Sequence, residues 1–185
     1  REAYALTLLW LATRIPSQEL AVRFPASVVA QLTLLAGEES QSGFLCARTV
    51  SRLAHRMSEA ALAASFPEAI VSCLASYVYL PNERGMYAAR ALQWLASRVP
   101  AWLLGYCFQA AAIGLLGQAA TLVVYNSSNP RRVLITPRSP HGNICGTVLV
   151  YLMERNEIDF PWPPACSDVS AAAVLWGLGA AEVGK

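Results

Sequence analysis

The sequence predicts a mainly α-helical protein: a compact bundle of six to seven helices around an uncharged central helix at about residues 101–125, with a β-hairpin at about 132–153 before the last helix. Three observations predict this fold. The chain has 185 residues, enough for one core without disulfides. Apolar residues recur three and four positions apart over most of it, and prolines divide it into segments of helical length. We therefore expect a single helical domain over 1–185, in which 126–166 form an insertion containing the hairpin and a proline-rich segment.

The composition limits the classes of protein to which the chain can belong. Hydrophobic residues make up 55% of it and charged residues 14%, with a net charge of +2 and a mean hydropathy of +0.38. These values exclude a disordered tail and a highly charged nucleic-acid-binding arm. They also exceed the apolar content that one soluble core of this size needs. The excess indicates a partner surface, a membrane or burial inside a larger assembly.

Five helices are expected in the first hundred residues, each bounded by proline or glycine. The clearest has its apolar residues at Cys46, Val50, Leu53 and Met57, spaced three and four apart, with arginines on another face. The five helices span residues 2–15, 26–36, 43–64, 65–80 and 83–99. No fixed-period repeat is evident among them, so we do not expect a solenoid of the common types.

Residues 99–130 carry no charge, and this segment allows two interpretations. Residues 101–125 are long enough to cross a bilayer. However, Gln109, Gln118 and many alanines and glycines lower their hydrophobicity, and a helix surrounded by other helices is also apolar on all sides. We expect a buried central helix, with a membrane span as the alternative.

The C-terminal third is expected to contain the β-structure. Residues 132–136 and 146–153 are rich in β-branched side chains and flank a loop of proline and glycine. Residues 159–164 form an extended proline-rich segment, and a last apolar helix follows at 169–178.

No arrangement of residues predicts catalysis or a cofactor. The five cysteines are too widely spaced for a metal site, and no glycine-rich phosphate loop is present, so we expect neither metal nor cofactor. His141 precedes Cys145 by four residues, but no nearby acid is available to orient the histidine as a base. We therefore assign no catalytic residue. The odd number of cysteines weakly favours a reducing, intracellular compartment.

Arginines supply the candidate contacts. Six arginines and no acid lie between residues 84 and 153, and guanidinium groups bind carboxylate and phosphate groups with two parallel hydrogen bonds. Nucleic-acid binding is not indicated, because aromatic residues are not interleaved with these arginines. The candidate partner-binding residues are Arg131, Arg132, Arg138 and His141 in the loop and Phe160 and Trp162 in the proline-rich segment, with a secondary basic stripe of Arg48, Arg52 and Arg56.

These observations together predict a non-enzymatic helical interaction or structural subunit of a larger assembly. Its partner is a protein or a second copy of the chain, bound through apolar surface and the arginine-rich loop, with an anionic surface as the target of the loop. The alternative is a membrane-embedded accessory subunit that uses residues 101–125. A hydrolase-like enzyme built on Cys145 and His141 is the third interpretation.

Overall fold

The computed structural model describes residues 1–120, 122–126, 133–137 and 139–156. These residues form ten helices and two strands, and the structure is mainly helical as predicted. The elements are α1 (Glu2–Arg14), α2 (Ser17–Arg23), α3 (Ala26–Ala36), α4 (Gln41–Arg56), α5 (Glu59–Ser65), α6 (Glu68–Tyr77), α7 (Glu83–Arg98), α8 (Ala101–Cys107), α9 (Ala110–Ala120), β1 (Leu122–Asn126), β2 (Val133–Pro137) and α10 (Gly142–Asn156).

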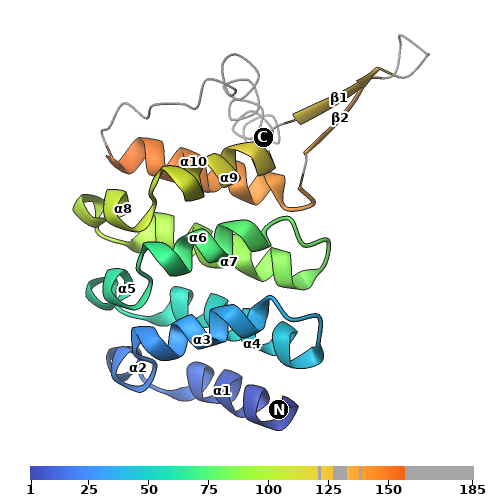
Figure 1. Ribbon diagram of the computed structural model, residues 1–185. Coiled ribbons are helices and arrows are strands. Elements are labelled where there is room, and N and C mark those ends of the chain that lie inside the picture. Colours follow the sequence, from blue (N-terminus) through green and yellow to red (C-terminus); the bar gives the residue numbers. More distant parts are fainter. Residues whose placement is uncertain (121, 127–132, 138, 157–185) are drawn as a thin grey trace, which may run out of the picture.

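The helices are stacked in layers and do not surround a central helix (Figure 1). Each layer has a short helix followed by an antiparallel pair: α2, α3 and α4 in the first, α5, α6 and α7 in the second, and α8, α9 and α10 in the third. The last helices of the layers form one continuous row, because α1 packs on α4, α4 on α7 and α7 on α10. The described helices therefore form a solenoid and not a compact bundle.

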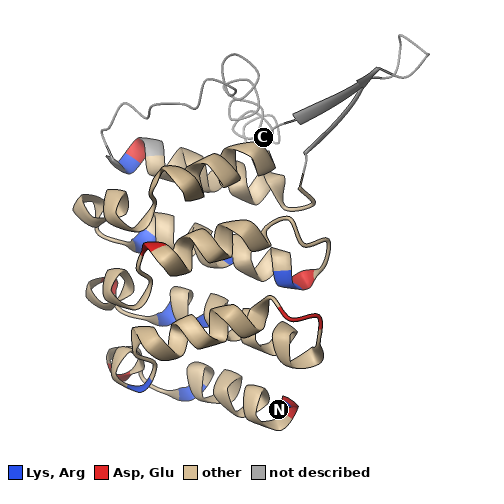
Figure 2. Ribbon diagram, viewed as in Figure 1, with Lys and Arg blue, Asp and Glu red and all other residues tan. Residues whose placement is uncertain are grey.

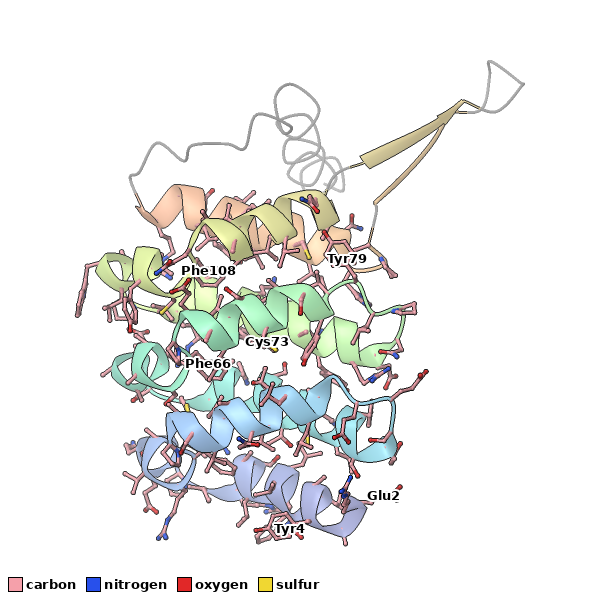
Figure 3. The ribbon with its side chains drawn as sticks, in the orientation of Figure 1. Glu2, Tyr4, Phe66, Cys73, Tyr79 and Phe108 are labelled. Carbon is pink, nitrogen blue, oxygen red and sulfur yellow. The ribbon has the colours of Figure 1, made fainter. Side chains whose placement is uncertain are left out.

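The layers follow a 42-residue repeat, so our expectation of no repeat was wrong. Phe24, Phe66 and Phe108 lie 42 residues apart, and each is buried at the residue that ends the short helix of its layer. Figure 3 labels Phe66 of the second layer and Phe108 of the third. The repeat is weak in the sequence, because few of its positions have the same residue in all three layers and many of the remaining residues are alanine. The buried leucines of the repeat are Leu20, Leu62 and Leu104 in the short helices and Leu32, Leu74 and Leu116 in the helices that follow.

The phenylalanines mark a sharp turn in every layer. Phe24 and Phe66 leave the helical conformation, with φ near −125° and ψ of 70° and 65°, and each precedes a proline. A residue before proline is excluded from the helical region by contact with the proline ring, so the short helix must end there. The next helix starts at angles of 81° in the first two layers and 87° in the third. Gln109 replaces the proline in the third layer, where Phe108 adopts a similar conformation.

Glycine is required at the start of α4 and of α7, where each helix passes the loop before it. A Cβ atom on Gly43 would lie 2.1 Å from the carbonyl oxygen of Glu38, and one on Gly85 would lie 2.3 Å from that of Leu80. Real Cβ atoms do not approach a carbonyl this closely. The two glycines are 42 residues apart and so are the two carbonyls, so the close approach is part of the repeat.

Arginines near the ends of the last helices join each layer to the one before it. Arg98 donates to the carbonyl oxygens of Met57 at 2.9 Å, of Ala54 at 3.4 Å and of His55. These carbonyls lie at the C-terminal end of α4, where helix carbonyls lack partners within the helix. The bond recurs in every layer: Arg56 donates to Ala12 at 2.7 Å and Arg155 donates to Ala96 at 2.6 Å.

A second set of bonds joins the opposite ends of the same helices. Arg84, at the start of α7, donates to the carbonyl oxygens of Gly37 at 3.0 Å and Glu38 at 2.5 Å. In the third layer the corresponding residue is His141, whose Nε2 lies 3.2 Å from the carbonyl oxygen of Leu80. The second and third layers are thus held to the layer before them at both ends of their last helix, and the first layer is held to α1 at one end, through Arg56.

The predicted central helix at 101–125 is not present. Residues of this range form α8 and α9, which meet at 87°, and then strand β1. The chain turns at Phe108, which leaves the helical conformation and whose side chain is buried. Within the described residues, no single helix is both long and apolar enough to cross a membrane. The short helix and its successor meet these criteria only as a bent pair, in each of the three layers.

The hairpin predicted at 132–153 is also not formed. Strand β2 overlaps the first predicted strand, but its antiparallel partner is β1, with Val124 opposite Ile135. The second predicted strand, at 146–153, lies within helix α10. Its β-branched residues favour a strand locally, but the spacing of Cys145, Val148 and Leu152 buries all three side chains in one helical face. Tertiary packing therefore overrides the local preference.

Other boundaries differ less. The helix predicted at 43–64 is divided into α4 and α5 at Met57, and the short helix α2 was not predicted. The helix predicted at 169–178 and the proline-rich segment at 159–164 lie outside the described residues.

Replacing Arg98 by alanine should destabilise the protein by about 2 kcal/mol. The substitution removes charged donors from three carbonyls, and hydrogen bonds to charged groups contribute roughly 1.5–3 kcal/mol. Arg90→Ala is the matched control, because Arg90 is exposed on the same helix and should change stability by less than about 0.5 kcal/mol. Urea denaturation measures both. Equal midpoints for the two variants would show that the bonds between layers contribute nothing.

Candidate functional site

The last helices of successive layers share an exposed side, which we call the ladder face. On α4 this side contains Arg48, Arg52 and His55, while most of the other residues in the middle of the helix are buried. Because the layers repeat, residues at corresponding positions form rows across α1, α4 and α7. The three rows are Leu6, Arg48 and Arg90; Trp10, Arg52 and Trp94; and Thr13, His55 and Ser97.

Two clefts lie side by side on the ladder face. The cleft between α4 and α7 has a volume of about 470 Å³, and the cleft between α1 and α4 has a volume of about 410 Å³. Arg48 and Arg52 line both, so the clefts are adjacent, one on each side of α4, and we refer to the two together as the groove. Its other lining residues are Ser51, His55, Tyr87, Arg90, Gln93 and Trp94 in the first cleft, and Leu6, Leu9, Trp10, Thr13 and Arg14 in the second.

The groove is positively charged. No acidic residue lines either cleft, and within the described part of the chain Arg48, Arg52 and Arg90 have no hydrogen bond or ion pair through their side chains. The acids nearest in sequence to these arginines are Glu39 in the loop before α4, Glu59 in the first turn of α5 and Glu83 in the first turn of α7. The loop before α4 and the start of α7 are coloured red at the right of Figure 2. With Arg14, which is also exposed and without such a partner, four guanidinium groups among the described residues that line the clefts face solvent without a counter-charge.

The pKa of His55 is affected by the positive charges in and beside the groove. Its ring packs against that of Trp94, with 4.3 Å between centroids and 43° between planes. Burial lowers the pKa of His55, and the charges of Arg52, Arg98 and Arg56 lower it further. The imidazole is therefore neutral at pH 7, and the positive charge of the cleft comes from arginine.

We expect Arg52→Gln to raise the pKa of His55 towards its ordinary value of about 6.5, because the substitution removes a nearby positive charge. A pKa below the unfolded value means that the unfolded chain binds the proton more readily, so stability decreases as pH falls below about 6.5. Arg52→Gln should lessen that decrease. An NMR titration of the imidazole measures the pKa, with Arg23→Gln on α2 as the control. An unchanged pKa in Arg52→Gln would contradict the proposed source of the potential.

The structure brings together part of the predicted basic stripe. Arg48 and Arg52 line the groove, but Arg56 is half-buried and donates to the carbonyl oxygen of Ala12. His141 was predicted to contact a partner; its side chain instead lies 3.2 Å from the carbonyl oxygen of Leu80 between layers. The other predicted contacts, Arg131, Arg132, Arg138, Phe160 and Trp162, lie outside the described residues.

Sequence reasoning missed Trp10, Arg90 and Trp94. The signal that identifies them is the 42-residue spacing, which places Arg90 beside Arg48 and both tryptophans in the row of Arg52. Without the repeat, nothing in the sequence indicates that Trp10 of α1 lies on the same side of the protein as Arg90 and Trp94 of α7.

Cys145 and His141 are not arranged for nucleophilic catalysis. Cys145 is completely buried, and burial raises the pKa of its thiol to about 12. An active cysteine nucleophile needs an accessible thiolate. No group of three or more metal-binding side chains occurs within the described ranges.

Cys145 should react with iodoacetamide at pH 7.5 only when the protein unfolds. Its thiol is inaccessible and protonated at this pH, whereas the half-buried Cys73 is the internal comparison and should be alkylated sooner. Mass spectrometry of proteolytic peptides after timed labelling gives each rate separately. Rapid alkylation of Cys145 in the folded protein would contradict this assignment.

The stacked three-helix layers place the described residues in the class of α-solenoids, whose repeats each pack only on their neighbours. Comparison of the chain with protein-family models, curated proteins and solved structures finds no match. The site must therefore be interpreted from its own geometry.

Proposed function

We propose that the protein is a non-enzymatic interaction scaffold that binds an extended segment of a protein partner along the ladder face. The observation that carries this proposal is the groove itself. It extends over α1, α4 and α7, and the residues that line it include two tryptophans and four arginines whose side chains have no hydrogen bond or ion pair among the described residues. Solenoids present extended surfaces of this kind, because each layer adds one more side chain to every row.

The dimensions of the groove suit an extended chain. Packed helices lie roughly 8–10 Å apart, and an extended peptide advances about 3.3 Å per residue. One layer therefore corresponds to about three residues of the ligand. A segment that crosses from the cleft beside Trp10 to the cleft beside Trp94 needs about six to nine residues.

The side chains of the groove are those that dominate binding energies at protein interfaces. Tryptophan and arginine are enriched among residues whose removal costs about 2 kcal/mol or more. Trp10 is 57% exposed and Trp94 is 36% exposed, so both rings are available to a ligand. The predicted contact through Arg131, Arg132 and Arg138 stays a separate prediction.

Selection of a displayed library of random twelve-residue peptides on the full chain tests the proposal. Enriched peptides should bind the protein, and Trp94→Ala or Arg52→Glu should weaken their binding at least tenfold. Trp102→Ala is the matched control, because Trp102 is 81% exposed on α8 and lines neither cleft. Failure to enrich peptides, or equal binding by all variants, would refute the proposal.

A further inference from the structure

The two clefts of the ladder face differ in chemistry although they are related by the repeat. Arg90 occupies the same repeat position as Arg48, so the cleft between α4 and α7 has an arginine from each of its helices and a third, Arg52, one turn further along. In the cleft between α1 and α4, the corresponding positions of α1 hold Leu6 and Trp10. At these positions the α1 side of the second cleft is apolar, and its one arginine, Arg14, lies at the end of the helix. We call the first cleft, which has an arginine at the same repeat position on both of its helices, the cationic cleft.

The cationic cleft has the charge and the donors to bind one compact dianion. A phosphorylated side chain carries a charge of about −1.5 to −2 at pH 7 and three strong acceptor oxygens. Arginine forks match such oxygens with paired hydrogen bonds, and one carboxylate would neutralise only one of the three guanidinium groups. The remaining polar lining residues, Ser51 and Gln93, offer further donors.

The positive charge is local, which argues against a nucleic-acid strand as the ligand. The corresponding positions of α1 hold Leu6, Trp10 and Thr13, none of them charged. On α10 the corresponding positions hold Thr147, Tyr151 and Glu154, the last of which is acidic. A polyanion needs cations along its whole length. Along these three rows arginine occurs only on α4 and α7, and Arg14, outside the rows, is the one arginine of α1 that lines a cleft.

We propose that the cleft between α4 and α7 binds a phosphorylated side chain of the partner segment, with the phosphate among Arg48, Arg52 and Arg90. This inference rests on the proposed function. The neighbouring cleft beside Trp10 takes an apolar side chain about three residues away, because one layer corresponds to about three extended residues. The ladder face thus recognises a phosphorylated residue and an apolar anchor at a set spacing.

Oriented peptide libraries test the proposal on the full chain. Three nine-residue libraries carry phosphoserine, serine or glutamate at the centre, and fluorescence anisotropy measures binding of the peptides selected from each. We expect the phosphoserine peptides to bind at least tenfold more tightly than their serine counterparts, with an apolar residue selected about three positions from the centre.

Two variants locate the effect. Arg48→Ala combined with Arg90→Ala should remove the preference for phosphoserine, while Arg23→Ala, an exposed arginine on α2, should preserve it. Both variants should keep the urea midpoint of the parent. The side chains of Arg48 and Arg90 make no hydrogen bond or ion pair among the described residues, and Arg23 is exposed.

The outcomes separate this inference from the proposed function. Equal binding of phosphoserine and serine peptides would overturn the inference but leave peptide binding in the groove. Absence of binding in all three libraries would overturn both. A twelve-nucleotide single-stranded RNA that displaces the peptides and binds more tightly than any of them would assign the site to nucleic acid.

Discussion

Hydrogen bonds from one layer to the backbone of the layer before it are the constraint on which the rest of the structure depends. At one end of the last helices, arginines such as Arg98 donate to helix C-terminal carbonyls; at the other end, Arg84 and His141 donate to the loop carbonyls of Glu38 and Leu80. Bonds at both ends oppose sliding and rotation of α7 on α4 and of α10 on α7, and Arg56 holds α4 to α1 at one end. They favour the alignment of the rows of the ladder face, which places the two clefts next to each other.

The same arrangement divides the arginines of the protein into two groups. Arg56, Arg84 and Arg98 are partly or largely buried and satisfy carbonyls, so their charge serves packing. Arg48 and Arg90 lie only a few residues away, yet they face solvent without partners. A basic stripe read from spacing alone mixes these two groups, as the predicted stripe ending at Arg56 did. Only the contact between layers shows which charges remain available to a ligand.

Much of the helical content could be predicted from the sequence, because capping residues, prolines and apolar periodicity act within a few residues. The layered arrangement could not be obtained this way, although one signal was present. Pro25 and Pro67 are 42 residues apart, and each follows a phenylalanine. The third layer hides the pattern, since Gln109 replaces the proline. The hairpin failed for a different reason, because the strand preference of 146–153 yields to burial of α10 against α7 and α9. Of the candidate site, Arg48 and Arg52 were predicted from the sequence. Trp94 can be assigned to the site only once the 42-residue repeat is known.

The segment between α9 and α10 shows how much freedom the loops of this solenoid have. From Gly85 to Gly142 the interval is 57 residues instead of 42, yet Arg155 still reaches Ala96 as Arg98 reaches Ala54. Fifteen additional residues, including β1 and β2, are accommodated without a change of register, as the weak dependence of closure entropy on loop length allows. The loop between α6 and α7 joins the same kind of helices in the second layer, but its carbonyl at Leu80 accepts the bond from His141. The segment between α9 and α10 is therefore the natural position for grafting a foreign domain or a fluorescent reporter, with the stack serving as a spacer.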